Sequence, residues 1–447
     1  MYRPRPPFSL SGGGSEGLRE NPESLLIAEL AGGEERYRLL ESSRQYARDK
    51  LTARGEQENV ARRHAFFYVD LAEQLELAWS TTPDREWLPQ AQVELENWRA
   101  ALEWALGKRS EVIVGQRLAA ARTVRRSFTL AEGRRWVRAS LELVDELTPP
   151  GLVARLEQAE ADGAAEFGEH KIALAAAERA LARYRQLGDA SGSAQAQNSA
   201  GGSLVLLGRP AEAEPMLREA LEAAYALGDR RLTASALQAI GWVRSVAGDF
   251  TGARVHLIEA LAMAQVLGTE SFAASVAVSL ADNEFLAGDC ETALQLTADL
   301  LETHGSLSAS PIIAVALVNM AAYLIALGRY DEGRVNANDA LERARALRVV
   351  VLVALSLLHL ALIAVLKPHV EGRRASTKYA GAARLFGFVD ARLTTMGGLG
   401  YPGLQREYDR ALAVLCDAVD ADDLAHLMAA GAMMTEDEAI EQAHALE

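Results

Sequence analysis

The segments AEAEPMLREALEAAYALG (211–228) and TGARVHLIEALAMAQVLG (251–268) lie 40 residues apart and share one pattern. In both segments apolar residues recur at helical spacing and a glycine ends the run, which predicts an amphipathic helix. Short glycine turns recur at the same interval, so residues 151–367 form an internal repeat. These turns contain Gly168, Gly208, Gly248, Gly288 and Gly328, and Pro368 occupies the next position.

Columns of small residues run in the same register. Small side chains at these intervals let two helices approach closely, so each unit is expected to be a helical hairpin. A neighbouring column of leucines is expected to supply the large partner in the packing. The small columns are Ala161, Gly201, Gly241, Ala281, Ala321 and Ala361; Ala173, Ala213, Ala253, Ala293 and Gly333; and Ala180, Ala220, Ala260, Ala340 and Ala380, interrupted by Leu300, and the leucines are Leu181, Leu221, Leu261, Leu301 and Leu341.

This twelve-then-seven spacing of small residues resembles the tetratricopeptide repeat (TPR) family. The resemblance implies an all-α, TPR-like superhelical solenoid of about six hairpins. The usual TPR period is about 34 residues, and the extra residues here fall around LGD (187–189) and LGDR (227–230), which predicts extended second helices. First helices are expected near 151–167, 191–207, 231–247, 271–287, 311–327 and 351–367.

The sequence before the repeat is expected to form three segments, a leader, a β-hairpin and a helix. Residues 1–23 are rich in Pro, Gly and Ser, which is typical of a disordered leader. SLLIAEL (24–30) and RYRLL (36–40) flank a glycine-containing turn and predict a two-stranded β-hairpin, followed by a helix from about Ser42 to Ala53.

The string RYRLLESSRQYARDKL (36–51) resembles a segment of bacterial signal-transduction ATPases of the STAND class. In that family the segment forms the wing of a winged-helix domain and the helix that leads into a helical-repeat arm. REWLPQAQVELENWRAALEWAL (85–106) resembles the linker after the wing, and YAGAARLFGFVDA (379–391) with LQREYDRALAVL (404–415) resembles the cap of the arm. Matching linker residues are Trp87, Leu88, Glu96, Asn97, Arg99, Ala101, Leu102 and Trp104.

The resemblance divides the chain into five parts. They are a leader (1–23), a winged-helix remnant (24–55), a helical linker (56–150), the TPR-like repeats (151–368) and a C-terminal helical cap (369–447). Neither an NTPase module nor a LuxR-type helix-turn-helix is recognisable, since the Gly-rich run GGGSEG (12–17) lacks the Lys-Ser or Lys-Thr of a P-loop. The chain is thus expected to be the arm alone.

Composition limits the classes of partner. A net charge of −15 disfavours direct binding of nucleic acid or of anionic membranes. Cys290 and Cys416 lack metal-type spacing and are expected to be ordinary core residues of a cytoplasmic protein. VVVLVALSLLHLALIAVL (349–366) just reaches the length of a membrane-spanning helix, but its register favours a buried solenoid helix in which His359 is a satisfied core histidine.

No catalytic constellation occurs in the sequence. Motifs such as His-Glu-x-x-His, Cys-x-x-Cys and Gly-x-Ser-x-Gly are absent, so we expect neither an enzyme nor a metal or cofactor site. Arginines between Arg117 and Arg138 are expected to form a solvated face beside acidic neighbours, with a docking site for an acidic partner or for phosphate as the alternative. The tryptophans Trp79, Trp87, Trp98 and Trp104 are expected to be core residues, with an aromatic cage as the alternative.

The concave face of a TPR stack is lined by its first helices. Counting from the small column places a polar set on this face in the first four repeats, whereas repeats five and six present apolar residues suited to docking against the cap. A polar groove suits an extended peptide or a partner helix, although mere solvation explains the polar residues equally well. The candidate binding residues are Gln158, Asp162, Gln195, Asn198, Gln238, Trp242 and Asp282, and the apolar positions are Val315, Val318, Ala322, Leu355, Leu358 and Leu362.

These features predict a non-catalytic interaction or sensor module related to STAND-type transcriptional regulators. The resemblance implies that a protein partner or a small inducer, bound in the groove, would bias a two-state equilibrium in an ATPase module. Two alternatives stay open, a C-terminal piece of a DNA-binding ATPase regulator and a structural scaffold. The ligand, the regulated process and the oligomeric state do not follow from the sequence.

Overall fold

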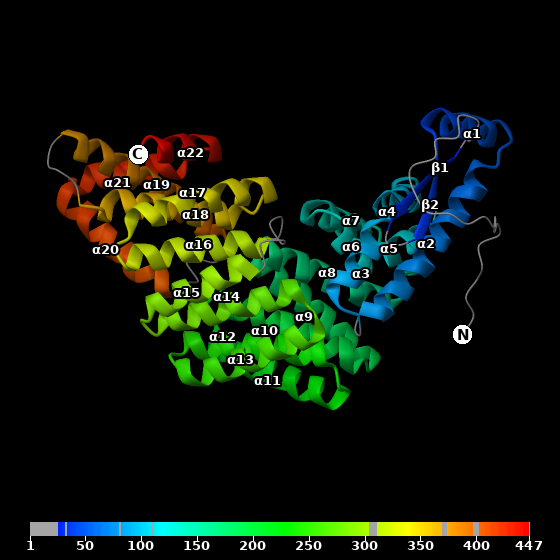
Figure 1. Cartoon of the computed structure of the whole chain (residues 1–447), viewed down its shortest axis with the longest axis horizontal. Coiled ribbons are helices and arrows are strands. Elements are labelled where there is room, and N and C mark those ends of the chain that lie inside the picture. The colour runs from blue at the N-terminus through cyan, green and yellow to red at the C-terminus, as the bar shows by residue number, and fades with distance from the viewer. Residues whose placement is uncertain are drawn as a thin grey trace. The chain divides into compact units, whose positions relative to one another are not determined.

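The structure, a computed structural model (Figure 1), describes residues 26–31, 34–79, 82–109, 111–303, 311–368, 373–396 and 402–446. The chain forms two compact units, Met1–His64 and Ala65–Glu447. The boundary between them falls within helix α2 (Gln57–Trp79). The expected disordered leader, residues 1–23, lies outside the described residues.

The first unit contains the expected hairpin and helix. Strands β1 (Leu26–Ala31) and β2 (Glu34–Leu39) pair antiparallel, with Leu26 opposite Leu39 and Ala31 opposite Glu34. Helix α1 (Glu41–Ala53) follows directly, and Gly55 adopts a positive φ of 68° after its end. The hairpin and helix are confirmed, while their assignment to a winged-helix domain stays a prediction.

The second unit begins with the linker helices, which enclose a tryptophan-rich core. Trp87 and Trp98 are buried, and their indole N–H groups donate to the carbonyl oxygens of Leu75 and Ala91 at 2.7 and 2.9 Å. Trp104 is also buried, so the core interpretation is confirmed for three of the four tryptophans. After α2 the linker consists of α3 (Asp84–Gln92), α4 (Leu95–Leu102), the π-helix η1 (Glu103–Gly107), α5 (Val112–Ala120), α6 (Arg122–Ser127) and α7 (Leu130–Glu142).

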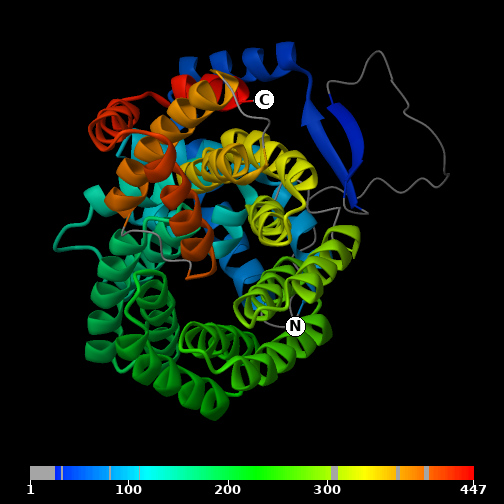
Figure 2. The ribbon, with the colours of Figure 1, turned by 90° about the vertical axis from the view of Figure 1, so that its left-hand side faces the viewer.

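Six helical hairpins follow, each within a few residues of its expected position. Figure 2 shows them succeeding one another around a curve, with neighbouring helices side by side. The first helices are α8 (Pro150–Glu166), α10 (Ala190–Leu206), α12 (Arg230–Val246), α14 (Glu270–Leu286), α16 (Pro311–Ala326) and α18 (Val350–Leu366), and the second helices are α9 (His170–Leu187), α11 (Pro210–Leu227), α13 (Phe250–Leu267), α15 (Cys290–Thr303), α17 (Tyr330–Leu347) and α19 (Arg373–Met396). The all-α TPR-like solenoid is thus confirmed.

The glycine turns have a clear conformational cause. Gly168, Gly208, Gly248, Gly288 and Gly328 all adopt positive φ, between 72° and 93°, where a side chain would be strained. The LGD motifs connect one hairpin to the next: Gly188 ends α9 in the left-handed conformation, and the Asp189 carboxylate accepts from the Gly192 N–H at 2.9 Å as an N-cap. The 40-residue period therefore reflects long helices on both sides, since α10 has 17 residues and α11 has 18.

Gly201 and Gly241 make room for large side chains on the second helices, but these side chains are not the leucines expected from the sequence. A Cβ atom at Gly201 would lie 2.5 Å from the Leu217 side chain, and one at Gly241 would lie 2.7 Å from the Leu257 side chain. Where the first helix carries alanine, the corresponding position of the second helix carries a smaller residue, as in the pairs Ala161/Ala177, Ala281/Thr297 and Ala321/Ala337. The side chains that fit Gly201 and Gly241 are therefore Leu217 and Leu257, which corrects the expected pairing, while Leu221 and Leu261 pack against neighbouring core clusters.

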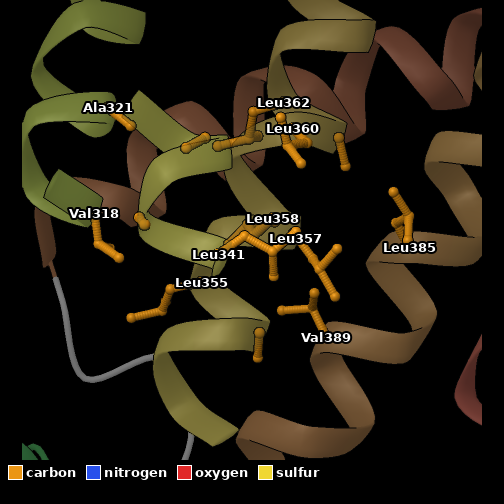
Figure 3. Close-up of a cluster of buried hydrophobic side chains, with 14 of the residues drawn as sticks. Val318, Ala321, Leu341, Leu355, Leu357, Leu358, Leu360, Leu362, Leu385 and Val389 are labelled. Atoms are coloured by element: carbon orange, nitrogen blue, oxygen red, sulfur yellow. The ribbon is translucent and has the colours of Figure 1, made fainter. Parts of the chain in front are cut away.

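The last hairpins and the cap share the largest core. Helix α18 is buried almost throughout, and Figure 3 shows its side chains meeting those of α16, α17 and α19. Leu358 and Leu362 belong to this core with Leu385 of α19 and Leu404 of α20 (Pro402–Ala418), both within the range 369–447 expected for the cap, which confirms that the apolar end of the stack docks against it. The cap continues with α20, α21 (Ala421–Ala432) and α22 (Glu436–His444). Within the described ranges, no helix has the length and apolar character needed to cross a membrane.

Candidate functional site

A large cavity runs along the first helices of the hairpins. Its volume is about 1830 Å³, and its other side is formed by the linker helices α3, α6 and α7. We call this cavity the groove. Five of the seven candidate residues line it: Asp162, Asn198, Gln238, Trp242 and Asp282. Gln158 lies buried beside it, and Gln195 is half-buried and outside the lining.

Most candidate amides connect neighbouring hairpins through serine. The Nδ2 of Asn198 donates to the Ser235 Oγ at 2.8 Å, and the Nε2 of Gln238 donates to Ser275 and Ser279 at 3.0 Å each. Gln158 donates in the same way to Ser199 at 2.9 Å. These four serines line the groove. They were missed from the sequence, although Ser235 and Ser275 occupy one 40-residue column and Ser199 and Ser279 occupy another.

The serine contacts give the groove wall a defined hydrogen-bonding pattern. Because each amide N–H₂ is held by a serine hydroxyl, its carbonyl oxygen is oriented as well. Within the described residues, the Asn198 Oδ1 accepts no hydrogen bond, although the atom is buried. A buried carbonyl without a partner is costly, so Asn198 offers an acceptor to a donor that enters the groove.

Most arginines of the cluster between Arg117 and Arg138 are paired with acidic neighbours, as expected from the sequence. Arg134 contacts Glu160 at 3.0 Å and Glu169 at 2.6 Å, and it is buried rather than solvated. Arg125 lies 3.5 Å from Asp162 inside the groove. Arginines predominate on the linker side of the groove, and carboxylates line the repeat side, at Asp162, Glu166, Glu270 and Asp282.

One tryptophan departs from the core interpretation. Trp79 is half-buried, and its ring lies between the guanidinium groups of Arg122 and Arg231, at 3.9 and 4.2 Å from the ring centroid. Arg231 also pairs with Asp84 at 3.2 Å. The arrangement satisfies two arginines on an aromatic face and holds the start of α3 against α12.

At the α20 end of the groove lies a small pocket, which we call the end pocket. It is lined by α12, α14, α16, α18 and α20, and Trp242, Asp282 and Leu355 belong to both cavities. Asp282 accepts hydrogen bonds from Asn319 at 2.9 Å and from the Tyr323 hydroxyl. Burial raises the pKa of Asp282 to about 7, and these two hydrogen bonds oppose the rise.

His359 lies in the wall of the end pocket and corrects an expectation. It is a buried core residue, as expected, but neither ring nitrogen has a hydrogen-bond partner in the described part of the chain. Burial lowers the pKa of His359 to about 3, so the ring is neutral at pH 7. One ring nitrogen is then a donor and the other an acceptor.

The cysteines also differ from expectation. Cys290 is half-buried at the start of α15 and Cys416 is exposed on α20, so neither is a core residue. In the described ranges, no group of three or more His, Cys, Asp or Glu side chains is placed to hold a metal ion.

Comparison with known proteins agrees with this architecture. Residues 192–265, which cover most of α10 to α13, match the sequence model of the tetratricopeptide repeat family. Relatives in Mycobacterium bovis and Mycobacterium tuberculosis, named as candidate HTH-type transcriptional regulators, are 39% identical over 83 residues. That match covers 19% of this chain and 9% of each relative, so it spans a small part of their length.

Solved structures show the same kind of fold. A Rap protein complexed with competence and sporulation factor aligns with a TM-score of 0.52 at 12% identity, over 82% of this chain and 99% of that chain. A STAND protein with a tetratricopeptide repeat sensor from Pyrococcus horikoshii aligns with a TM-score of 0.42 at 14% identity, over 75% of this chain and 55% of that chain. The first likeness places this chain among TPR-like helical solenoids.

Proposed function

We propose that this chain is a non-catalytic interaction module that binds an extended segment of a partner protein in the groove. The observation that carries the proposal is the groove itself, a cavity of about 1830 Å³ lined by polar side chains from successive hairpins. A small-molecule pocket is typically about 300–1,000 Å³. The volume therefore favours a polypeptide over a small inducer.

The pattern of the lining supports an extended ligand. Oriented serine and amide groups recur from α10 to α14, at Asn198, Gln238 and Ser275. A peptide backbone carries donors and acceptors at regular intervals, so repeated polar groups along a groove match its main chain. The Rap structure supports the proposal in a general way, since a solenoid of this fold there holds a bound factor.

The relation to regulators suggests what binding would do. In an arm attached to an ATPase module, a partner that binds one conformation more tightly would shift the equilibrium of the whole protein. The second candidate, a piece of a DNA-binding regulator, is favoured by the matching segment in the mycobacterial relatives. In both candidate functions, the groove binds a segment of a partner protein.

Affinity purification from the host with the full chain as bait tests the proposal. Ser235→Tyr would fill the groove, and Trp242→Ala would remove its aromatic side chain; both residues line the cavity. Val255→Tyr is a matched control, because Val255 is exposed on α13 and outside the groove. We expect one partner to be retained by the control and lost with both groove variants, as measured by quantitative mass spectrometry. Equal recovery with all variants would contradict binding in the groove.

A further inference from the structure

The end pocket contains a carboxylate without a positive partner. Asp282 is half-buried and lines both the groove and the end pocket. Its hydrogen-bond donors, Asn319 and Tyr323, are neutral. No ion pair joins Asp282 to a Lys or Arg side chain within the described residues. A carboxylate withdrawn from water is normally paired with a cation or takes up a proton, and Asp282 has only neutral partners, so it can accept a positive group from a ligand.

The contrast with Asp162 makes this absence informative. Asp162 lines the same groove three hairpins before Asp282, and its carboxylate is paired with Arg125 at 3.5 Å. Desolvation dominates the environment of Asp282 and raises its pKa to about 7. The free protein therefore supplies no cation to Asp282, in contrast to the Arg125 guanidinium that it supplies to Asp162.

The end pocket suits a small positive head, and Trp242 and Leu355, which line both the end pocket and the groove, can flank an aliphatic stem that reaches it. Trp242 and Phe285 supply aromatic rings, whose faces attract cations. Leu355 and Val318, both drawn in Figure 3, supply apolar surface from α18 and α16. His359 is neutral and has a ring nitrogen that can accept a hydrogen bond.

We propose that the end pocket binds a primary ammonium group on an aliphatic stem, carried by the segment that occupies the groove. The ammonium group donates to the Asp282 carboxylate, beside the hydrogen bonds from Asn319 and Tyr323, and supplies a counter-charge. This inference rests on the proposed function, because it assigns a chemical class to one anchor of the bound segment. A lysine side chain carries this ammonium group on a four-carbon stem, and the free amino end of a chain carries an ammonium group directly on its Cα.

The size of the end pocket and the charge of Asp282 favour an ammonium group over other ligand heads. The space open to small groups in the end pocket is about 30 Å³, enough for a head of one or two water volumes. A ligand carboxylate would face Asp282 at close range and be repelled. A planar guanidinium needs more room than an ammonium group, and a neutral head would leave the charge of Asp282 uncompensated.

Blocked amino acids test the pocket directly on the full chain. Nα-acetyl-lysine methylamide carries the ammonium group, and Nα-acetyl-norleucine methylamide has the same stem without the charge. We expect the lysine compound to bind at least about tenfold more tightly in a ligand-observed NMR titration. Equal affinities of the wild-type protein for the two compounds, or no binding of either, would overturn the inference without any variant being needed.

Two substitutions assign the effect to Asp282. Asp282→Asn keeps an oxygen that accepts from Asn319 and Tyr323, so we expect it to fold and to lose the preference for lysine. Asp162→Asn, the matched control, changes a carboxylate that already has a cation, and the preference should persist. A preference that survives in Asp282→Asn would overturn the inference.

Two octapeptides then separate the sources of the ammonium group. One has a single internal lysine and an acetylated amino end, and the other has a free amino end and no lysine. The tighter peptide identifies the source, and failure of both to bind more tightly than an acetylated, lysine-free peptide would contradict the inference. A partner that needs the groove but ignores Asp282→Asn would refute only the ammonium site. Lysine binding with a partner indifferent to Ser235→Tyr would refute only the proposed function.

Discussion

Asp282 links the stability of the protein to pH. Its pKa is raised from 3.8 to about 7 in the folded protein, because burial disfavours the charged form. The folded protein thus holds this proton more tightly than the unfolded chain. The resulting stability is complete below about pH 4 and is lost as the pH rises through 7. At about 1.4 kcal/mol per pH unit, the loss is at most about 4 kcal/mol.

The comparison with Asp282→Asn isolates this contribution from the other titrating groups. Asparagine cannot ionise, so the free energy of unfolding of the wild type minus that of the variant should fall between pH 4 and pH 8. Urea unfolding at several pH values measures the difference. A difference that is independent of pH would show that Asp282 is ionised normally in the folded protein.

Gly241 tests the packing of one helical hairpin. A Cβ at this position would lie 2.7 Å from the Leu257 side chain and 3.4 Å from the Ala253 carbonyl oxygen. Overpacking of this kind costs about 1–3 kcal/mol, so Gly241→Leu should lower thermal stability, and Gly241→Ala should do so by less. Adding Leu257→Ala to Gly241→Ala should cost less than the sum of the single changes, because it recreates the natural Ala321/Ala337 pair.

Gly202→Ala is the matched control for Gly241. Gly202 lies in a first helix, and a Cβ there would meet no atom within 4 Å. Alanine in a helix is favoured over glycine by about 0.5–1 kcal/mol, so this variant should be neutral or stabilising. Destabilisation by Gly202→Ala, or unchanged stability of Gly241→Leu, would contradict the packing described here.

At the residue scale, the sequence predicted which residues lie at close helix contacts better than it predicted which side chains they contact. The small column identified Gly201 and Gly241 as sites of close helix approach, because glycine at fixed spacing has few other causes. It could not identify Leu217 and Leu257 as partners, since that depends on the rotation of two helices about their axes. Likewise, the unsatisfied nitrogens of His359 depend on three-dimensional neighbours that no local pattern encodes.

Helices α19 and α21 cross at two glycines. A Cβ at Gly387 would clash with the backbone of Met428, and a Cβ at Gly431 would clash with the backbone of Arg384. Backbone atoms cannot rotate away as side-chain ends can. We therefore expect Gly387→Ala to separate these helices and to cost about 3 kcal/mol or more in thermal or chemical unfolding.

Gly381 is a graded control on the same helix as Gly387. A Cβ at Gly381 would meet the ends of the Gln442 and Leu446 side chains at 2.7 and 2.8 Å, and these ends can move. Gly381→Ala should therefore cost less than Gly387→Ala. If both variants were equally stable, the crossing of α19 and α21 would be looser than the structure indicates.

Elements were predicted well wherever the repeat was regular. The bounds of α12, expected at 231–247 and found at Arg230–Val246, follow from a glycine turn at one end and an aspartate cap at the other. The groove serines escaped prediction, because serine is also common on solvated helix faces. Gln195 was placed in the groove by counting alone, and the structure leaves it outside the lining.

At the scale of the second unit, the linker folds back onto the third hairpin. The Asp84 N–H donates to the Gly268 carbonyl at 3.0 Å, and the Arg231 guanidinium donates to the Thr82 carbonyl at 2.9 Å and pairs with Asp84. The stack of Arg231 on Trp79 adds to this contact. These interactions fix α3 as one wall of the groove.

Arg231→Ala should release that wall without unfolding the repeats. The change removes an ion pair, a hydrogen bond and a cation–π contact from a buried site, at a cost of about 2–4 kcal/mol. Hydrogen exchange in α3 should become faster, while exchange in α10 and α11 should change little. Arg230→Ala is the control, because Arg230 is exposed beside it. Unchanged exchange in α3 would mean that other contacts hold the linker.

This closure could not be predicted from the sequence. Arg231 and Asp84 are 147 residues apart, and no periodic signal relates them. The repeat predicts only contacts between successive hairpins, since each buries its surface against the next. The existence of the groove was therefore predictable, whereas its second wall and the end pocket were not.

Site-specific photo-crosslinking tests the central claim, that the concave groove binds a partner segment, most directly. A photoreactive amino acid would be placed at Ser275 in the groove or at Val255 on the exposed face of α13. Irradiation in the host should yield one partner crosslinked from Ser275 and none from Val255. The same partner crosslinked from Val255 alone would place the binding surface outside the groove and contradict the account.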